Sequence, residues 1–336
     1  MKQLNLKAYA KINLAIDVLG KLPSGYHEVS MVMQQIELHD KVSVKWLPDK
    51  GYEQKTKLIQ LNQKDDLKNA CGNDIADIVI ETNSNKKYLP RDERNLAYKA
   101  AQLMIDRFDI SSKIGSGKVK IDIKKQIPVG AGLGGGSADC AAVLHGLSRI
   151  WKLNLSLDKL CELGAELGAD VPFCIMGQGG KTAAHAQGTG TELTAIQGID
   201  IWLVLTKPPI SVSTAEVYKG FSEIQDKNFE RPDTDELILA MKEKNIPMIK
   251  KNIVNVLENF TLKAYASVMY TKNKVIHDTK PLKAVMSGSG PTIIGFYESE
   301  ESAQIAYDNM KLVNKETFIT KTLLNIGRNG GNNVGI

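Results

Sequence analysis

Three features are scarce in this chain of 336 residues, and each scarcity excludes a class of protein. There are four cysteines, Cys71, Cys140, Cys161 and Cys174, without C-x-x-C spacing, so neither a disulfide framework nor a zinc site is expected. No apolar run approaches the length of a membrane span, and the polar N-terminus lacks the apolar stretch of a signal peptide. We therefore expect a cytoplasmic protein with buried thiols and no membrane partner.

Charge of one sign is also scarce. The 43 basic and 38 acidic residues give a formal net charge of +5, which is too mild and too scattered to indicate nucleic-acid binding but suits an anionic small substrate. With 43% hydrophobic and 24% charged residues the chain can bury a sizeable core. Its length exceeds that of a usual single domain, which predicts two domains that share a cleft.

Glycine, in contrast, is concentrated in one stretch. Five of the seven residues from 130 to 136 are glycine, and they lie between a β-rich segment, residues 121–127, and an apolar helical pattern that begins near Ser137. The pattern has apolar residues at spacings of three and four: Cys140, Val143, Leu144, Leu147 and Ile150. The first N–H groups of a helix have no partner inside it and, together with the helix dipole, attract anions. A loop almost free of side chains before such a helix predicts a phosphate site.

Two other glycine-rich phosphate-binding motifs match this stretch less well. The spacing of Gly130, Gly132 and Gly135 satisfies the dinucleotide fingerprint, but that motif also needs a following strand with an acidic residue about 20 positions on. Residues 151–167 have a helical pattern instead, and Asp158 lies inside it. A Walker loop needs a lysine that this loop lacks. A flexible surface loop is the remaining alternative, although the flanking segments are well patterned.

Lys11 lies in the first predicted strand. Residues 7–17 alternate in polarity, which predicts a strand with one buried face, and from this pattern alone Lys11 is favoured as a solvated lysine on the open face. Residues 23–27 then carry a turn signal, where a lone His27 is more often a packing or surface residue than a site residue. Residues 29–44 predict one or two strands interrupted at Asp40.

Three more polar residues have ordinary structural interpretations. Asn95 directly precedes a helical pattern and is a suitable N-cap. Asp170 stands two residues before Pro172, a common way to begin a helix, so a cap is favoured on the sequence alone. Tyr218 lies in a helical pattern that begins at Ser213 or Thr214 and fits either the core or a site.

Three segments of the chain resemble motifs of a known enzyme family. The segment PVGAGLGGGSA, residues 128–138, resembles the nucleotide loop of the GHMP kinases, which include galactokinase, homoserine kinase and mevalonate kinase. Residues 168–173, GADVPF, resemble the segment that carries this family's catalytic aspartate, and residues 284–297 resemble its third motif. The resemblance covers nearly the whole chain outside residues 49–76 approximately, which we expect to be an insertion, and the last ten residues.

The resemblance gives a fold to the mixture of helices and strands that predicts two α+β domains. It implies a ribosomal protein S5 domain 2-like N-terminal domain, residues 1–186, and a ferredoxin-like C-terminal domain, residues 187–336. The boundary is placed in the glycine-rich stretch at 177–190. The site is expected between the two domains.

The resemblance also implies ATP with Mg²⁺ and assigns the catalytic pair. Asp170 becomes the candidate base and Lys11 the cation that keeps it ionised. The implied ATP-binding residues are Asn95, Pro128, Gly130, Gly132, Leu133, Gly134, Gly135, Gly136, Ser137 and Ala138. A dedicated magnesium-binding glutamate, known in some members, has no convincing equivalent here, and Ser137 is a possible metal or phosphate ligand.

The acceptor is implied by a shorter match. Residues 25–27, GYH, resemble the cytidine-binding segment of the branch that phosphorylates a cytidine diphosphate-linked methylerythritol in the non-mevalonate isoprenoid pathway. The implied substrate-binding residues are Asn13, Tyr26, His27, Tyr218, Gly288 and Ser289. Another GHMP kinase, such as homoserine kinase, and a non-catalytic GHMP-fold sensor are the alternatives. Retention of both Lys11 and Asp170 favours an enzyme.

Overall fold

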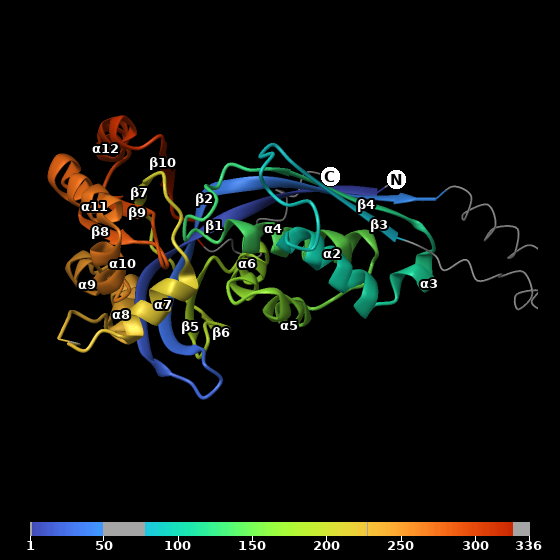
Figure 1. Cartoon of the computed structure of the whole chain (residues 1–336), viewed down its shortest axis with the longest axis horizontal. Coiled ribbons are helices and arrows are strands. Elements are labelled where there is room, and N and C mark those ends of the chain that lie inside the picture. Colours follow the sequence, from blue (N-terminus) through green and yellow to red (C-terminus); the bar gives the residue numbers. More distant parts are fainter. Residues whose placement is uncertain (1, 50–77, 227, 325–336) are drawn as a thin grey trace, which may run out of the picture.

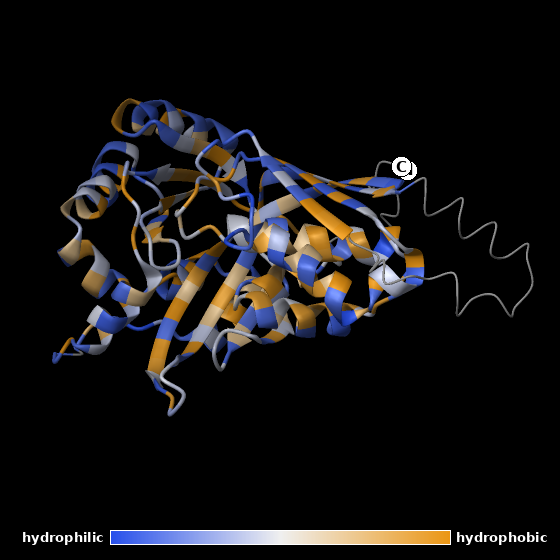
Figure 2. Cartoon of the chain, turned by 45° about the vertical axis from the view of Figure 1, so that its right-hand side comes forward, coloured by the Kyte–Doolittle hydropathy of each residue, from blue (hydrophilic) through white to orange (hydrophobic). Residues whose placement is uncertain are grey.

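The computed structural model describes residues 2–49, 78–226 and 228–324, whose elements form two groups side by side (Figure 1). Apart from Asp49, the predicted insertion at about 49–76 lies outside the described residues, as do the last ten residues, 327–336. In the part of the chain that is described, no helix has both the length and the apolarity needed to cross a bilayer, and polar residues recur along the helices (Figure 2).

The first group is a six-stranded sheet with helices on one face (Figure 1). Its strands are β1 (Lys2–Lys21), β2 (His27–Pro48), β3 (Ile78–Ser84), β4 (Gly117–Lys124), β5 (Ala183–Gln187) and β6 (Glu192–Ala195). Its helices are α2 (Leu96–Arg107), α3 (Ile110–Ile114), α4 (Gly135–Ile150), α5 (Leu157–Leu167) and α6 (Val171–Gln178). The long β2 pairs with β1 along one edge and with both β4 and β5 along the other, and β3 runs parallel to β4.

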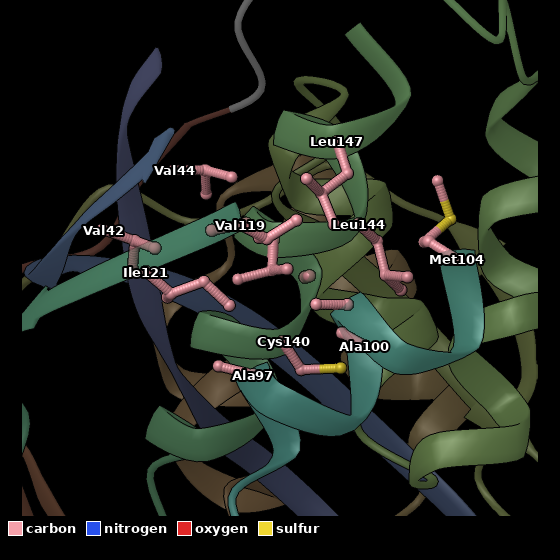
Figure 3. Packing of buried hydrophobic residues seen from close by; sticks show 14 of the residues in the cluster. Val42, Val44, Ala97, Ala100, Met104, Val119, Ile121, Cys140, Leu144 and Leu147 are labelled. Carbon is pink, nitrogen blue, oxygen red and sulfur yellow. The ribbon is translucent and has the colours of Figure 1, made fainter. Parts of the chain in front are cut away.

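The first core lies between this sheet and the helices α2 and α4 (Figure 3). It includes Val42, Val44, Ala97, Ala100, Met104, Val119, Ile121, Cys140, Leu144 and Leu147, all buried. The helix α4 was expected to bury one stripe, but Ala141 and Ala142, which lie outside that stripe, are fully buried as well. The reason is that α4 packs against the sheet, α2, α5 and α6 together, so the loop before it is held by a fixed element.

The second group is an antiparallel sheet with strand order β10-β7-β9-β8. Its strands are β7 (Trp202–Lys207), β8 (Lys283–Met286), β9 (Ile293–Tyr297) and β10 (Glu316–Lys321). Its helices are α7 (Thr214–Ser222), α8 (Thr234–Glu243), α9 (Ile246–Asn252), α10 (Glu258–Ala264), α11 (Ala266–Thr279) and α12 (Glu300–Val313). A second core joins the two groups, because Ile12, Leu14 and Ile36 pack in one cluster with Leu205 and Phe296.

Three expectations about the first group need correction. The strand β1 is buried on both faces, with Lys11 4% and Asn13 1% exposed. The second group packs on the apolar face of Ile12 and Leu14, whereas the glycine loop and α6 cover the face of Lys11 that was expected to be open. β2 continues through Asp40, whose side chain points into the protein. The stretch at 177–190 contains β5, and β6 extends the first sheet beyond residue 187, so the sheet does not end at the expected boundary.

Candidate active site

The glycine loop connects β4 to α4. Gly130, Gly132 and Gly134 have φ angles of 61°, 71° and 66°, a region that favours glycine. With Gly134 in this conformation α4 begins at Gly135, two residues before the expected start at Ser137. The Ala138 N–H donates to the Gly134 carbonyl at 2.9 Å. The earlier N–H groups of the first turn have no acceptor within the helix and are suited to an anion.

Two of these glycines make room for protein. A Cβ on Gly132 would lie 2.3 Å from the Ser287 carbonyl oxygen, and a Cβ on Gly134 would lie 2.8 Å from Lys11 Cγ. The Ser287 hydroxyl donates to the Gly132 carbonyl at 3.0 Å, and the Lys11 N–H donates to the Leu133 carbonyl at 3.0 Å. The loop is therefore held between β1 and the turn after β8.

The remaining candidate ATP-binding residues differ in solvent exposure. Gly130 and Gly136 are exposed, whereas Pro128, Leu133 and Ala138 are buried and hold the loop against its surroundings. Ala138 in particular has no free N–H, because the helix uses it. Its expected contact with ATP is therefore not available through the main chain.

A buried ionic cluster lies beneath the loop. The Lys125 ammonium contacts the carboxylate of Asp40 and lies 2.8 Å from Asp139 Oδ2. Asp40 Oδ1 also accepts from the Ile127 N–H at 2.9 Å. Burial raises the pKa of the Asp139 carboxyl, which shares its cation with a second acid. The cluster ties β2, the start of the glycine loop and the first turns of α4 together.

Lys11 and Asp170 meet beside this loop. Lys11 Nζ lies 3.3 Å from Asp170 Oδ2 and donates to Asn13 Oδ1 at 2.9 Å. The Lys11 side chain is 5% exposed and that of Asp170 is 35% exposed. Asp170 stands at the N-cap position of α6, but its side chain makes no cap hydrogen bond. The solvated-lysine interpretation and the helix-cap interpretation are thus both wrong, because tertiary packing pairs the two side chains.

A cleft of about 960 Å³ lies in front of this pair, between the two groups of elements. The predicted site residues that line it are Lys11, Asn13, Tyr26, His27, Gly132, Ser137, Asp170, Tyr218, Gly288 and Ser289. They come from β1, the β1–β2 turn with the start of β2, the glycine loop with the first turn of α4, the start of α6, α7 and the turn after β8, so segments far apart in sequence meet here. In that last turn, Ser289 Oγ lies 2.9 Å from the Thr214 hydroxyl of α7.

One end of the cleft carries aromatic rings. The ring centroids of His27 and Tyr218 lie 5.1 Å apart at an interplanar angle of 43°, and Tyr26 is 69% exposed beside them. Burial and, to a smaller extent, the charge of Lys21 lower the pKa of His27. Burial and then the charge of Asp170 raise the pKa of the Tyr218 hydroxyl well above its ordinary value. Both rings are therefore neutral at physiological pH.

Asn95 lies outside the lining of this cleft. Its side-chain oxygen accepts from the Ala97 N–H at 3.0 Å, and its amide donates to the Pro90 carbonyl at 2.9 Å. The N-cap interpretation of Asn95 is thus confirmed. Its expected place near the adenine stays a prediction.

Few groups in the cleft suit a metal ion. Among residues 2–49, 78–226 and 228–324, no group of three or more His, Cys, Asp or Glu side chains could hold one. Asp170 and Ser137 are oxygen donors that line the cleft. Mg²⁺ commonly binds through one or two protein oxygens, substrate phosphates and water, so this donor set fits an ion that arrives with a nucleotide.

Several residues that line the cleft were not predicted from the sequence, namely Lys21, Thr189, Thr214, Lys219, Ser222 and Glu223. Thr214 and Ser222 stand four residues before and after Tyr218 on α7, so helical periodicity around that tyrosine could have found them. Lys21 ends β1 just before the turn that carries Tyr26, and its position next to that turn was the available signal.

Comparisons with known proteins agree with this geometry. The sequence profile of the GHMP kinases N terminal domain matches residues 95–178, and that of the GHMP kinases C terminal matches residues 228–315. The 4-diphosphocytidyl-2-C-methyl-D-erythritol kinase of Alkaliphilus metalliredigens is 41% identical over 323 residues, covering 96% of this chain and 97% of that protein. The enzyme of the same name from Acetivibrio thermocellus is 40% identical over 326 residues, covering 96% and 100%.

Solved structures share the fold. A crystal structure of 4-(cytidine 5'-diphospho)-2C-methyl-D-erythritol kinase has a TM-score of 0.72 at 23% identity and covers 95% of this chain and 99% of its own. Homoserine kinase from Cytophaga hutchinsonii has a TM-score of 0.64 at 14% identity, covering 97% and 96%. The predicted two-domain α+β fold of the GHMP kinases is confirmed.

Proposed function

The chain belongs to the 4-diphosphocytidyl-2-C-methyl-D-erythritol kinases of the GHMP kinase superfamily, and on this premise we propose how its own residues carry out the reaction. The enzyme transfers a phosphoryl group from ATP to a hydroxyl of the cytidine diphosphate-linked methylerythritol of the non-mevalonate isoprenoid pathway. The observation that carries the mechanism is the Lys11–Asp170 pair, 3.3 Å apart at the wall of the cleft.

Phosphoryl transfer needs an aligned hydroxyl, an acceptor for its proton and stabilisation of phosphate charge. Asp170 takes the proton, because it is the carboxylate beside the buried ammonium and its side chain is still 35% exposed toward the cleft. Lys11 keeps that carboxylate ionised and polarises the hydroxyl. Asn13 holds the ammonium in place by accepting from it at 2.9 Å.

The glycine loop supplies the phosphate site. Its N–H groups at Gly135, Gly136 and Ser137 point out of the first turn of α4, and the helix dipole adds a favourable field. When Mg²⁺ is bound with ATP, it neutralises phosphate charge, and Ser137 and Asp170 are the protein oxygens available to it. Pro128, Leu133 and Ala138 support the loop from beneath, and Asn95 is proposed to approach the adenine.

The cytidine end of the acceptor occupies the aromatic end of the cleft. Tyr26 and Tyr218 cover the faces of the pyrimidine, and the neutral His27 reads its edge. Gly288 and Ser289 close the cleft from the second sheet. We place the reaction in the cytoplasm, with neither nucleic acid nor membrane as a partner.

An acceptor screen tests the assignment. ADP release is measured with the cytidine diphosphate form of methylerythritol, its uridine analogue and homoserine. The cytidine form should be phosphorylated well and the uridine form poorly, because opposing two acceptors at the pyrimidine edge costs roughly 1–3 kcal/mol. Homoserine as the good acceptor would instead indicate another GHMP kinase, and no ADP release with any acceptor would indicate a sensor.

A further inference from the structure

The hydroxyl of Ser222 links His27 to the helix that carries Tyr218. Ser222 is the last residue of α7, and its Oγ donates to the Tyr218 carbonyl oxygen, one turn earlier, at 2.9 Å. The same Oγ lies 2.6 Å from His27 Nε2. Ser222 and His27 both line the cleft.

Only one arrangement of hydrogens makes both of these contacts hydrogen bonds. A carbonyl oxygen can only accept, so the hydroxyl hydrogen lies between Ser222 and Tyr218. The Ser222 oxygen must then accept from His27, which requires a hydrogen on Nε2. A neutral imidazole carries one N–H, so its Nδ1 keeps a lone pair.

The charge state of the ring supports this arrangement. Burial and the nearby charge of Lys21 lower the pKa of His27, so the ring is neutral at physiological pH. Its ring lies against that of Tyr218, with centroids 5.1 Å apart, which fixes the plane in which Nδ1 can act.

We infer that Ser222 is a positioning residue that holds His27 in the tautomer with hydrogen on Nε2, and that the resulting acceptor at Nδ1 selects a pyrimidine with an exocyclic amino group. The inference rests on the proposed function and adds to it a residue that sets the base preference. The amino group of cytosine donates to Nδ1. The carbonyl of uracil opposes one acceptor with another.

Binding of a uridine form requires the other tautomer. With hydrogen on Nδ1, Nε2 becomes an acceptor, and the Ser222 hydroxyl must turn to it and give up its hydrogen bond to the Tyr218 carbonyl. That lost hydrogen bond is the cost that Ser222 adds, and it corresponds to a factor of about 3 to 10 in rate. Without the hydroxyl, the imidazole exchanges tautomers freely.

Kinetics of two variants test the inference. In Ser222→Ala, kcat/KM for the uridine form should rise about 3- to 10-fold, while that for the cytidine form should fall by about twofold. Ser222→Thr keeps a hydroxyl at this position and should restore the wild-type ratio. An unchanged ratio in Ser222→Ala, or a loss for both forms in equal measure, would overturn the selective role.

The tautomer is measured independently on the enzyme without substrate. The ¹⁵N chemical shifts of the His27 ring, assigned by their loss in His27→Gln and recorded well above the ordinary histidine pKa, should show a protonated Nε2 and a bare Nδ1. Hydrogen on Nδ1 would overturn the inference whatever the kinetics show. If the wild-type enzyme phosphorylates neither pyrimidine form, the proposed function fails, and the ring shifts still decide the tautomer.

Discussion

Replacing Asp170 by asparagine separates the proposed base from its structural surroundings. The change conserves volume and leaves an amide oxygen that can still accept from the Lys11 ammonium. Asp170 makes no cap hydrogen bond on α6, and Lys11 keeps its 2.9 Å contact with Asn13. Since the Asp170 side chain is 35% exposed, loss of the ion pair should cost only about 1 kcal/mol of folding free energy.

The effect on turnover should be far larger. Loss of a general base lowers kcat by about 10²-fold or more. The affinity for ATP should change little, because the glycine loop is held by Lys11 main chain and Ser287, neither of which Asp170 supports. Lys11→Met should also lower kcat. The double variant should lose less than the product of the two single losses, because the two residues act as a unit.

The assay couples ADP release to the cytidine form of methylerythritol, with calorimetric ATP binding and a thermal melt as controls. A folded Asp170→Asn variant that turns over within a few-fold of wild type would refute the role of Asp170 as the base. Strictly multiplicative losses in the double variant would refute the claim that Lys11 acts through it.

Four further predictions concern the glycine loop, the buried ionic cluster beneath it and the pyrimidine pocket. Gly134→Ala should lower both kcat and ATP affinity, because its φ is 66° and its Cβ would lie 2.8 Å from the proposed catalytic lysine. Gly20→Ala, whose Cβ would meet nothing within 4 Å, is the control outside the proposed site, and equal losses of turnover and ATP affinity in the two variants would contradict this prediction. Asp40→Asn should destabilise the fold by about 3–5 kcal/mol, since it leaves the buried Lys125 ammonium and the Ile127 N–H with a weaker acceptor. Asp139→Asn should cost less than about 1 kcal/mol in denaturant unfolding, because the ion pair of Lys125 with Asp40 remains. Burial raises the pKa of Asp139, so the folded state binds a proton at this carboxyl more tightly than the unfolded state does. The stability of the wild type relative to Asp139→Asn should therefore rise as the pH falls from neutral toward the ordinary pKa of aspartate, and the opposite trend would contradict the raised pKa. Tyr218→Ala should lower kcat/KM for the cytidine and uridine forms alike, about 2- to 10-fold from lost stacking, and a changed ratio between them would show that the ring also reads the base edge.

Local chemistry let the sequence predict most elements and their ends. Asn95 and Ser213 cap the helices that they precede, because a side-chain oxygen can satisfy the free N–H groups of a first turn wherever the chain goes next. The turn at 23–27 and the hairpin around it follow from Gly25, with φ at 87°. The glycine loop was predicted to be a phosphate site for the same reason, since the features behind that prediction lie within a dozen residues.

The site itself needed the tertiary structure. On the sequence alone Lys11 was favoured as a solvated lysine and Asp170 as a cap, and only the resemblance reversed both interpretations. A strand pattern cannot show that the glycine loop and α6 cover its polar face. It equally cannot show that residues 159 positions apart meet at 3.3 Å.

The roles of the loop glycines and of Ser222 also depend partly on the sequence and partly on the tertiary structure. The sequence determined that the loop has almost no side chains, because composition is local. Only the folded chain shows that a side chain at Gly132 or Gly134 would collide with Ser287 or Lys11. Only packing of α7 against the β1–β2 turn put the Ser222 hydroxyl 2.6 Å from His27, since hydrogen-bond geometry between distant segments is set by how elements pack and not by their order along the chain.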